Sequence, residues 1–364
     1  MANININFDR LNYLLELFDF NSINELAEYI GVKEIKNPLT KTILNKIDNI
    51  FKRGLDFYTN PNSIDNKQSS ILFRKNNIQE KLNVGDKQLI SKIEQQISYI
   101  SGLAKITNFN FSTRKFGQFN INDNPREVAK QMQFLLVNNI KDDKKFLQSF
   151  IDNLAEYNIL VIEEVQPSRL KYKSNLCGFF IEPNVIVLKK QQSRKREIFT
   201  LAHELGHYLL KREHIDKNIF NADVNLEEKW CNKFAFHLLA SNEIDELDDI
   251  AKDDMNITNK KILRFSSKRH ISRLAIFYYY ADNKKISWKE YNRLSKELEE
   301  EFDNKREINK LKGVKYRPSK PIISPLKKDI FVDAFLNNII DEYTIRTEFS
   351  RNINNNNLEE FIYG

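Results

Sequence analysis

The stretch REIFTLAHELGHYLLKREH, from Arg196 to His214, is the most informative part of this 364-residue chain, because it holds three of the five histidines. His203 and His207 are four residues apart, so on an α-helix both imidazoles leave the same face about one turn apart. That spacing lets two nitrogens reach one Zn²⁺ at roughly 2.0 to 2.1 Å. Glu204 follows the first histidine and completes an HExxH motif, whose chemistry is two metal ligands and a glutamate general base.

Apolar residues surround the motif, which predicts that its polar side chains are buried in a helix. A buried histidine or glutamate without a partner costs roughly 1 to 3 kcal/mol, and a metal ion supplies that partner. Gly206 costs roughly 1 kcal/mol relative to alanine inside a helix, so we expect another element to pack close to its backbone. The short pattern also occurs by chance, so a structural protein with an accidental HExxH and no metal is one alternative.

A catalytic zinc site needs a third protein ligand beside an open position. The next expected helix, LEEKWCNKFAFHLLA, carries Glu228 and Asn232 four residues apart on one face. Glu228 is the candidate ligand, and Asn232 can orient a ligand histidine through its other ring nitrogen. Glu227 is the alternative ligand. Either glutamate can instead be a solvated residue at a helix start.

The remaining histidines are not expected to bind the metal. His214 does not complete an HExxHxxGxxH pattern, because this chain has Leu210 and Glu213 where that pattern requires Gly and His. We expect His214 in a polar loop. His237 lies among apolar residues and is expected to be a packing residue, whereas His270, in SSKRHISRL, is expected at the surface.

The order of periodic segments predicts an α+β domain around the motif. PREVAKQMQFLLVNNI and KKFLQSFIDNLAEYN have helical spacing, and ILVIEEV is a short β-branched run typical of a strand. CGFFIEPNVIVLKK predicts a hairpin about its Glu-Pro-Asn turn. Helices, a small sheet and then two site-bearing helices make an α+β domain.

Breaks in the helical pattern divide the chain into five parts. The breaks are NPNSIDNKQSS and FGQFNINDNP before the motif and RPSKPIISP after it. We expect a helical region over 1–60, a linker and helical segment over 61–118, the motif-bearing domain over 119–245, a helical extension over 246–315 and a C-terminal segment over 316–364.

Composition points to a globular protein without a membrane segment. Hydrophobic residues make 41% and charged residues 29% of the chain, with 9 Gly and 8 Pro, which excludes collagen-like and loop-rich classes. The net charge of +7 is spread over alternating Lys and Glu, a weak sign of an acidic partner. Cys177 and Cys231 have no paired spacing, so we expect no thiolate metal site, no disulfide and a cytoplasmic location. No window reaches roughly 18 apolar residues, so no membrane partner is expected.

REIFTLAHELGHYLL followed by EEKWCNKFAFHLLA resembles the ImmA/IrrE family of metallopeptidases, in which an FTLAHELGH segment precedes an E-x-x-A-N-x-F-A segment. SILFRKNN resembles the FRK stretch of longer members, so the resemblance covers about residues 70 to 280. It implies a zincin-like metallopeptidase domain, an α+β fold flanked by helical N- and C-terminal regions. It also implies His203, His207 and Glu228 as Zn²⁺ ligands and Glu204 as the catalytic base.

The N-terminal region resembles half of a helix-turn-helix. Long ImmA/IrrE relatives often begin with such a motif of the phage-repressor type, and FNSINELAEYIGV is similar to its first half. Only KEIKN then precedes Pro38, which is too short for a recognition helix. If the next helix, LTKTILNKIDNIF, takes that role, Lys41, Thr42 and Asn45 meet DNA. The alternative is a degenerate module for protein contacts or stability.

The resemblance implies a zinc-dependent endopeptidase whose substrate is a helix-turn-helix transcriptional repressor, so that cleavage derepresses genes of a mobile element or a stress response. The chain departs from the family at Cys231, where alanine is usual, and in LLAS, where Leu-Leu-Met-Pro is frequent. Both changes leave the metal site credible. The alternative function is a zinc-containing transcriptional regulator that binds a repressor or DNA without proteolysis.

Overall fold

The computed structural model describes residues 3–62, 64, 82–167, 170–191, 193–211, 215–216, 226–250, 255–312, 320–350, 353 and 357–364. The chain divides into two compact units, one made of residues 1–103 with 167–176 and the other of residues 104–166 with 177–364. Helices predominate and the sheets are small, so the α+β class expected from the sequence is confirmed. None of the described helices combines the length and apolarity needed to span a membrane.

The first unit is built from short elements around an apolar core. In chain order these are β1 (Asn3–Ile4), α1 (Phe8–Leu17), α2 (Ile23–Tyr29), β2 (Leu39–Thr40), α3 (Lys41–Phe51), α4 (Leu55–Thr59) and most of α5 (Val84–Ile106). β1 pairs antiparallel with β2. Leu11, Leu14, Leu44 and Phe51 are fully buried between the helices. Ser91 of α5 donates a hydrogen bond to the carbonyl of Phe51 at 2.6 Å, which fastens α5 to the end of α3.

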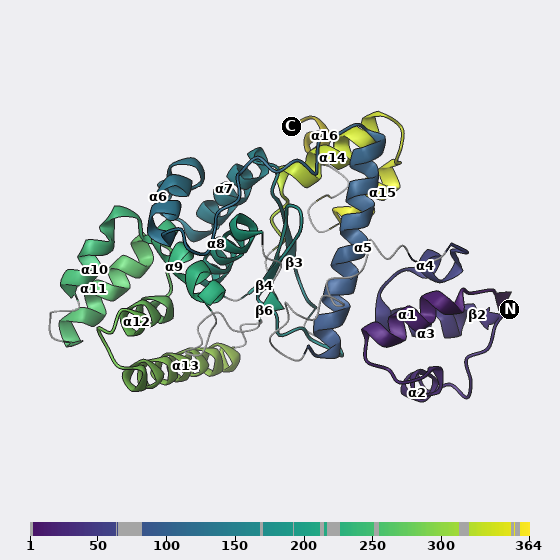
Figure 1. Ribbon diagram of the computed structural model, residues 1–364, viewed down its shortest axis with the longest axis horizontal. Helices are drawn as coiled ribbons and strands as arrows, with labels where there is room; N and C mark the ends of the chain where they lie inside the picture. The colour runs from purple at the N-terminus through teal and green to yellow at the C-terminus, as the bar shows by residue number, and fades with distance from the viewer. Residues whose placement is uncertain are drawn as a thin grey trace. The chain divides into compact units, whose positions relative to one another are not determined.

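The second unit contains the HExxH motif. Its elements are α6 (Pro125–Leu136), α7 (Asp143–Glu156), β3 (Leu160–Glu164), β4 (Gly178–Ile181), β5 (Val185–Lys189), α8 (Arg194–Leu210), β6 (Ile215–Asp216), α9 (Leu226–Ala240), a 3₁₀ turn (Ser241–Glu243), α10 (Ile244–Ile250), α11 (Met255–Lys268), α12 (Arg273–Asp282), α13 (Trp288–Leu311), α14 (Pro325–Leu336), α15 (Glu342–Glu348) and α16 (Leu358–Tyr363). Helices α6 to α9 lie on one side of the sheet, and α10 to α13 lie beyond them (Figure 1).

The sheet of this unit is mixed, in the order β3-β5-β4-β6. The expected hairpin is confirmed, because β4 and β5 pair antiparallel with Gly178 opposite Leu188. β3 is parallel to β5, with Leu160 opposite Val185, so the isolated strand expected before the hairpin joins its far side. β3 to β5 are buried nearly throughout, as a sheet covered by helices requires.

The chain after residue 320 returns to the free edge of β3. Ile323 forms an antiparallel bridge with Ile162. The backbone N–H of Ile322 donates to Oε2 of Glu163 at 2.6 Å. The expected C-terminal segment therefore contacts the sheet of the motif-bearing unit through one bridge and one side-chain hydrogen bond.

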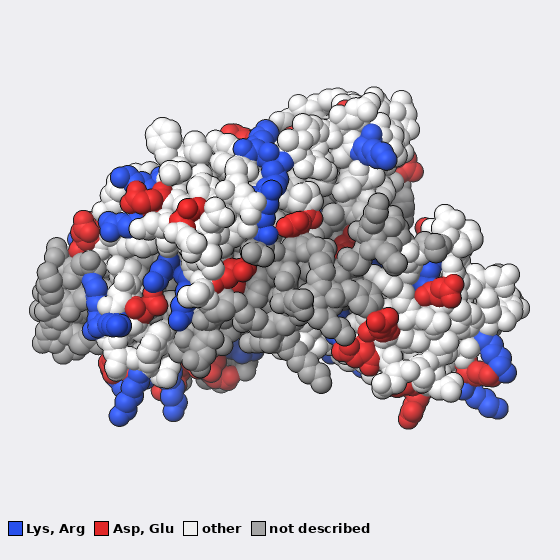
Figure 2. Space-filling view, in the orientation of Figure 1, with Lys and Arg blue, Asp and Glu red and all other residues white. Residues whose placement is uncertain are grey.

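The surface carries charges of both signs. On the face shown in Figure 2, the described Lys and Arg side chains are interspersed with Asp and Glu and leave wide uncharged areas between them.

Candidate metal centre

Helix α8 places the HExxH motif in the interior of the second unit. Ser193 caps its first turn by accepting a hydrogen bond from the backbone N–H of Arg196, and the helix ends at Lys211 in the left-handed conformation. The helix packs on β4 and β5 on one side and on α9 on the other, so it is apolar almost all round. His203, Glu204 and His207 are 0%, 3% and 1% exposed.

Helix α9 packs closely against the backbone of α8 at Gly206. A β-carbon at this position would lie 3.0 Å from the sulfur of Cys231 and 3.2 Å from its Cα. A side chain would therefore push the helices apart, which explains a glycine inside a helix. The close packing expected at Gly206 is confirmed, and it brings the side chains of α9 to the HExxH face.

Three side chains from the two helices converge on one point. Glu228 bridges the histidines, with Oε2 3.1 Å from Nε2 of His203 and Oε1 3.0 Å from Nε2 of His207. The two Nε2 atoms are 3.1 Å apart. The structure therefore brings together the three residues predicted as ligands, each of them buried.

This arrangement fits a zinc ion. Two imidazoles and a carboxylate are the donor set of one class of catalytic zinc sites. Ligand atoms of a tetrahedral site with bonds of about 2.0 to 2.1 Å lie about 3.3 to 3.4 Å from one another, a few tenths of an ångström more than the separations of His203, His207 and Glu228. A small outward movement of these side chains would accommodate the ion.

Two further residues of α9 lie behind the histidines. Oδ1 of Asn232 is 3.0 Å from Nδ1 of His203, so it can accept a hydrogen bond from Nδ1–H. The proton then stays on Nδ1, and Nε2 faces Glu228 without a proton. Oε1 of Glu227 is 3.4 Å from Nδ1 of His207, on the side of the ring away from the convergence point. Of the two glutamates considered as third ligand, the geometry favours Glu228 and places Glu227 as an outer partner of His207.

The charge state of Glu228 suits a ligand. Burial disfavours the charged carboxylate, but His207 and His203 outweigh it and hold the pKa of Glu228 well below its ordinary range. A metal ligand must be deprotonated, as this carboxylate is. Although burial works against it, Cys231 and Glu228 raise the pKa of His207, so a metal ion that binds there displaces a proton. Burial raises the pKa of the Cys231 thiol to about 12, which keeps this sulfur protonated beside the site.

Glu204 lies where the start of β4 meets α8. A β-carbon at Gly178 would be 2.6 Å from Cγ2 of Thr200 and 3.3 Å from Cγ of Glu204. Only glycine fits there, and its absence of a side chain lets the strand approach the proposed base. Gly178 is not among the residues predicted from the sequence, where its signal is a glycine at the first position of an apolar strand.

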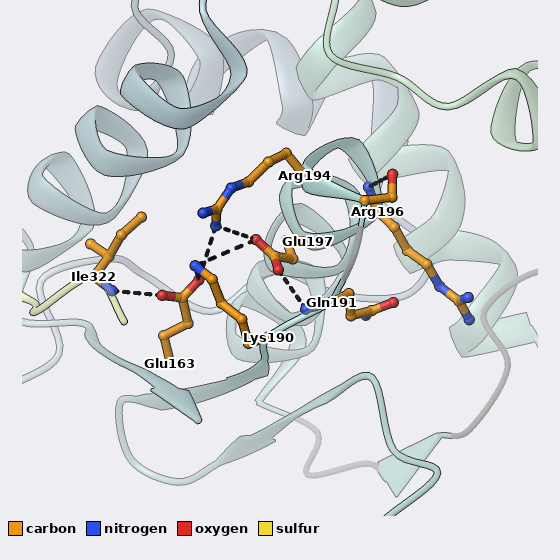
Figure 3. A network of polar contacts seen from close by, with 8 residues as sticks. Glu163, Lys190, Gln191, Arg194, Arg196, Glu197 and Ile322 are labelled. Carbon is orange, nitrogen blue, oxygen red and sulfur yellow. Dashed lines mark hydrogen bonds and ion pairs between the residues drawn. The ribbon is translucent and has the colours of Figure 1, made fainter. Parts of the chain in front are cut away.

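The first turn of α8 is fixed by buried charges (Figure 3). Arg194 pairs with Glu197 at 2.7 Å, and Lys190 pairs with Glu163 at 2.5 Å. The pairs are joined through Arg194 and Glu163 at 3.5 Å. These contacts link the end of the sheet to the start of the motif helix, and they join residues whose pairing has no signal in the sequence pattern.

The other histidines differ in how they match expectation. His237 is half-buried and edge-on to Phe236 and Tyr279, as expected for a packing residue. The surface position expected for His270 is wrong, because its ring is buried against Phe146 with centroids 4.1 Å apart. Its nitrogens contact Asp143 and the Ile140 carbonyl, partners 127 and 130 residues away. His214 lies outside the described residues.

The N-terminal candidates belong to the first unit. Lys41, Thr42 and Asn45 are exposed on α3. Residues 30–40 separate α2 from α3 and include β2, whereas a helix-turn-helix joins its helices by about 3 to 4 residues. The expected helix-turn-helix is therefore not confirmed, and DNA contact by these three side chains stays a prediction.

The part of the chain that matches a known family includes the candidate metal centre. No curated protein and no solved structure matches the chain. Residues 155–266 match the family described as the IrrE N-terminal-like domain, Peptidase_M78. This span runs from the end of α7 into α11 and includes α8 and α9 entire. The match supports the resemblance to the ImmA/IrrE family and a metallopeptidase-family function for this part of the chain.

Proposed function

We propose that this chain is a zinc-dependent endopeptidase that cleaves a helix-turn-helix transcriptional repressor and so derepresses mobile-element or stress genes. The observation that carries the proposal is the convergence of His203, His207 and Glu228 from two helices. Glu204 lies beside them on α8, as a general base requires. The choice of repressor as substrate rests on the family resemblance.

The chain's own residues supply binding and proton transfer. His203, His207 and Glu228 would hold the zinc, and Asn232 keeps the proton of His203 on Nδ1. When bound, zinc lowers the pKa of water to about 7 and polarises a peptide carbonyl. The Glu204 carboxylate takes the proton of the attacking water as the new C–O bond forms. It returns that proton to the amine that leaves when the C–N bond breaks.

Neighbouring glutamates provide a matched test of the ligand set. Glu228→Gln should abolish stoichiometric zinc binding by the purified protein, because it removes a ligand. Glu227→Gln should keep the zinc with an affinity lowered about 10- to 100-fold, because it removes an outer partner. Zinc content by mass spectrometry and competition with a chelator measure both. Zinc retained by Glu228→Gln and lost by Glu227→Gln would reverse the assignment.

Co-expression with a candidate repressor, such as one encoded beside this chain, tests the activity. We expect repressor fragments with the wild-type chain, and none with chelator or with Glu204→Gln, which should still bind zinc. Full cleavage by a zinc-loaded Glu204→Gln protein would refute this mechanism. An intact repressor released from DNA would instead indicate the non-proteolytic regulator.

Direct DNA binding has less support than a protein substrate. Residues 3–62 carry eight acidic and seven basic side chains. DNA-binding domains present a clear basic excess on one face. Residues 3–62 therefore fit a role in protein contacts or stability better than a role in DNA recognition.

A further inference from the structure

Asn232 must be held in one orientation to serve the metal centre. The carbonyl and amino ends of an asparagine side chain have almost the same shape, but only the carbonyl oxygen accepts a hydrogen bond. If the amide turned over, its NH₂ group would face Nδ1 of His203 and favour the wrong tautomer. A second partner that accepts a hydrogen bond from the amino end stabilises the productive orientation further.

Tyr278 of α12 supplies that partner. Its side chain forms a hydrogen bond with the side chain of Asn232. The bond favours the charged form of Tyr278, as a donor to its oxygen does, so Nδ2–H of Asn232 donates to the hydroxyl oxygen of Tyr278 while Oδ1 faces His203. Asn232 and Tyr278 also line the same small pocket, together with Phe199 and Ala275, so both side chains face one point between α9 and α12.

The ring of Tyr278 is itself held in place. It is 6% exposed and lies edge-on to Trp288 and Tyr291, with centroids 5.6 Å and 6.1 Å away. Burial and the nearby Asp282 raise the pKa of Tyr278 to about 12, although the bond from Asn232 works in the opposite direction. The hydroxyl is thus neutral at physiological pH and stationary.

We propose that Tyr278 is a positioning residue of the metal centre, which locks the Asn232 amide so that His203 keeps its proton on Nδ1 and presents Nε2 to the metal. The inference rests on the proposed zinc site. It also gives a role to α12, which lies beyond the matched residues 155–266. The site is then built from three helices, and the third comes from the helical extension.

The test measures zinc affinity by competition with a chromophoric chelator. Tyr278→Phe keeps the ring and removes the hydroxyl, and it should weaken zinc binding about 3- to 10-fold, at or below the range for direct outer partners. Tyr280→Phe is the matched control, because Tyr280 is also buried on α12 and donates a hydrogen bond to the Leu247 carbonyl at 3.0 Å, away from the site. Tyr280→Phe should leave the zinc affinity within about twofold of the wild-type value. Thermal unfolding of the metal-free proteins checks that both variants fold.

A double-mutant cycle separates positioning from general structural support. Asn232→Ala should weaken zinc binding about 10- to 100-fold, and Tyr278→Phe should add nothing on that background. Equal affinities of wild type and Tyr278→Phe, or the same loss with and without Asn232, would overturn the inference while leaving the zinc site intact. A wild-type protein that binds no zinc would overturn the proposed function and this inference together.

Discussion

Replacing Glu163 by leucine tests how the start of the motif helix is held. The side chains of Glu163 and Lys190 are 0% and 2% exposed and lie 2.5 Å apart. Arg194 and Glu197 add a second pair, so two cations balance two carboxylates inside the protein. Glu163 also accepts the backbone N–H of Ile322 at 2.6 Å. Removing this one carboxylate leaves two cations facing one anion.

The expected cost follows from this balance. Breaking a buried pair by removing one partner costs about 3 to 5 kcal/mol, so Glu163→Leu and Lys190→Met should each lower the free energy of unfolding by that amount. The double replacement leaves Arg194 and Glu197 paired at 2.7 Å and the charges balanced. Its remaining cost is the N–H of Ile322 without its acceptor, about 1 to 3 kcal/mol. The coupling between the two substitutions is therefore at least about 3 kcal/mol.

Denaturant unfolding of the metal-free protein measures these energies. Trp230 and Trp288 are the two tryptophans and both lie in the second unit, so fluorescence reports on the unit that contains the pairs. Arg293→Ala is the control, because Arg293 pairs with glutamates at the exposed surface of α13, where solvent screens the charges, and its loss should hardly change the free energy of unfolding. Additive costs of the two buried substitutions, or single costs no larger than the control, would refute the reasoning.

Three further substitutions test local features. Burial and nearby cations lower the pKa of His237 from 6.5 to about 4. Between these two pKa values the unfolded chain binds a proton that the native state excludes. The free energy of unfolding should therefore fall by up to about 3 kcal/mol as the pH drops from about 6.5 to about 4. In His237→Gln this dependence on pH should disappear from urea titrations. Gly102→Ala, on α5 with no described atom within 4 Å of the added carbon, should raise thermal stability by up to about 1 kcal/mol. Gly85→Ala on the same helix should lower it by about 1 to 3 kcal/mol, since the added carbon lies 2.5 Å from the backbone of Lys173; a gain would show that this backbone moves freely. Circular dichroism during heating measures both glycine variants.

Local periodicity was enough to predict much of the second unit. The helices before the sheet, the strand at Leu160–Glu164 and the hairpin followed from spacing and turn residues. The spacing of His203, His207 and Glu228 placed them on helix faces, and Gly206 indicated where the helices would meet. These predictions are correct because each feature depends on residues that are close together in the sequence.

Contacts between distant segments could not be predicted in this way. His270 resembles a surface residue in its own window, and its partners lie on and near α7. β3 pairs with the β5 edge of the β4–β5 hairpin and not with its β4 edge. The sequence of β3 does not determine this choice. Tyr278 stands in a tyrosine-rich helix where nothing local distinguishes it from its neighbours. In each case the deciding partner is far away in the sequence.

The bridge between Ile162 and Ile323 also bears on how the protein is made. During synthesis β3 emerges about 160 residues before Ile323, so until then the outer edge of β3 and one oxygen of the Glu163 carboxylate lack their final partners. Open strand edges invite pairing with other chains. A fragment cut to the matched residues 155–266 would keep that edge open permanently, and we expect it to aggregate where the full chain does not.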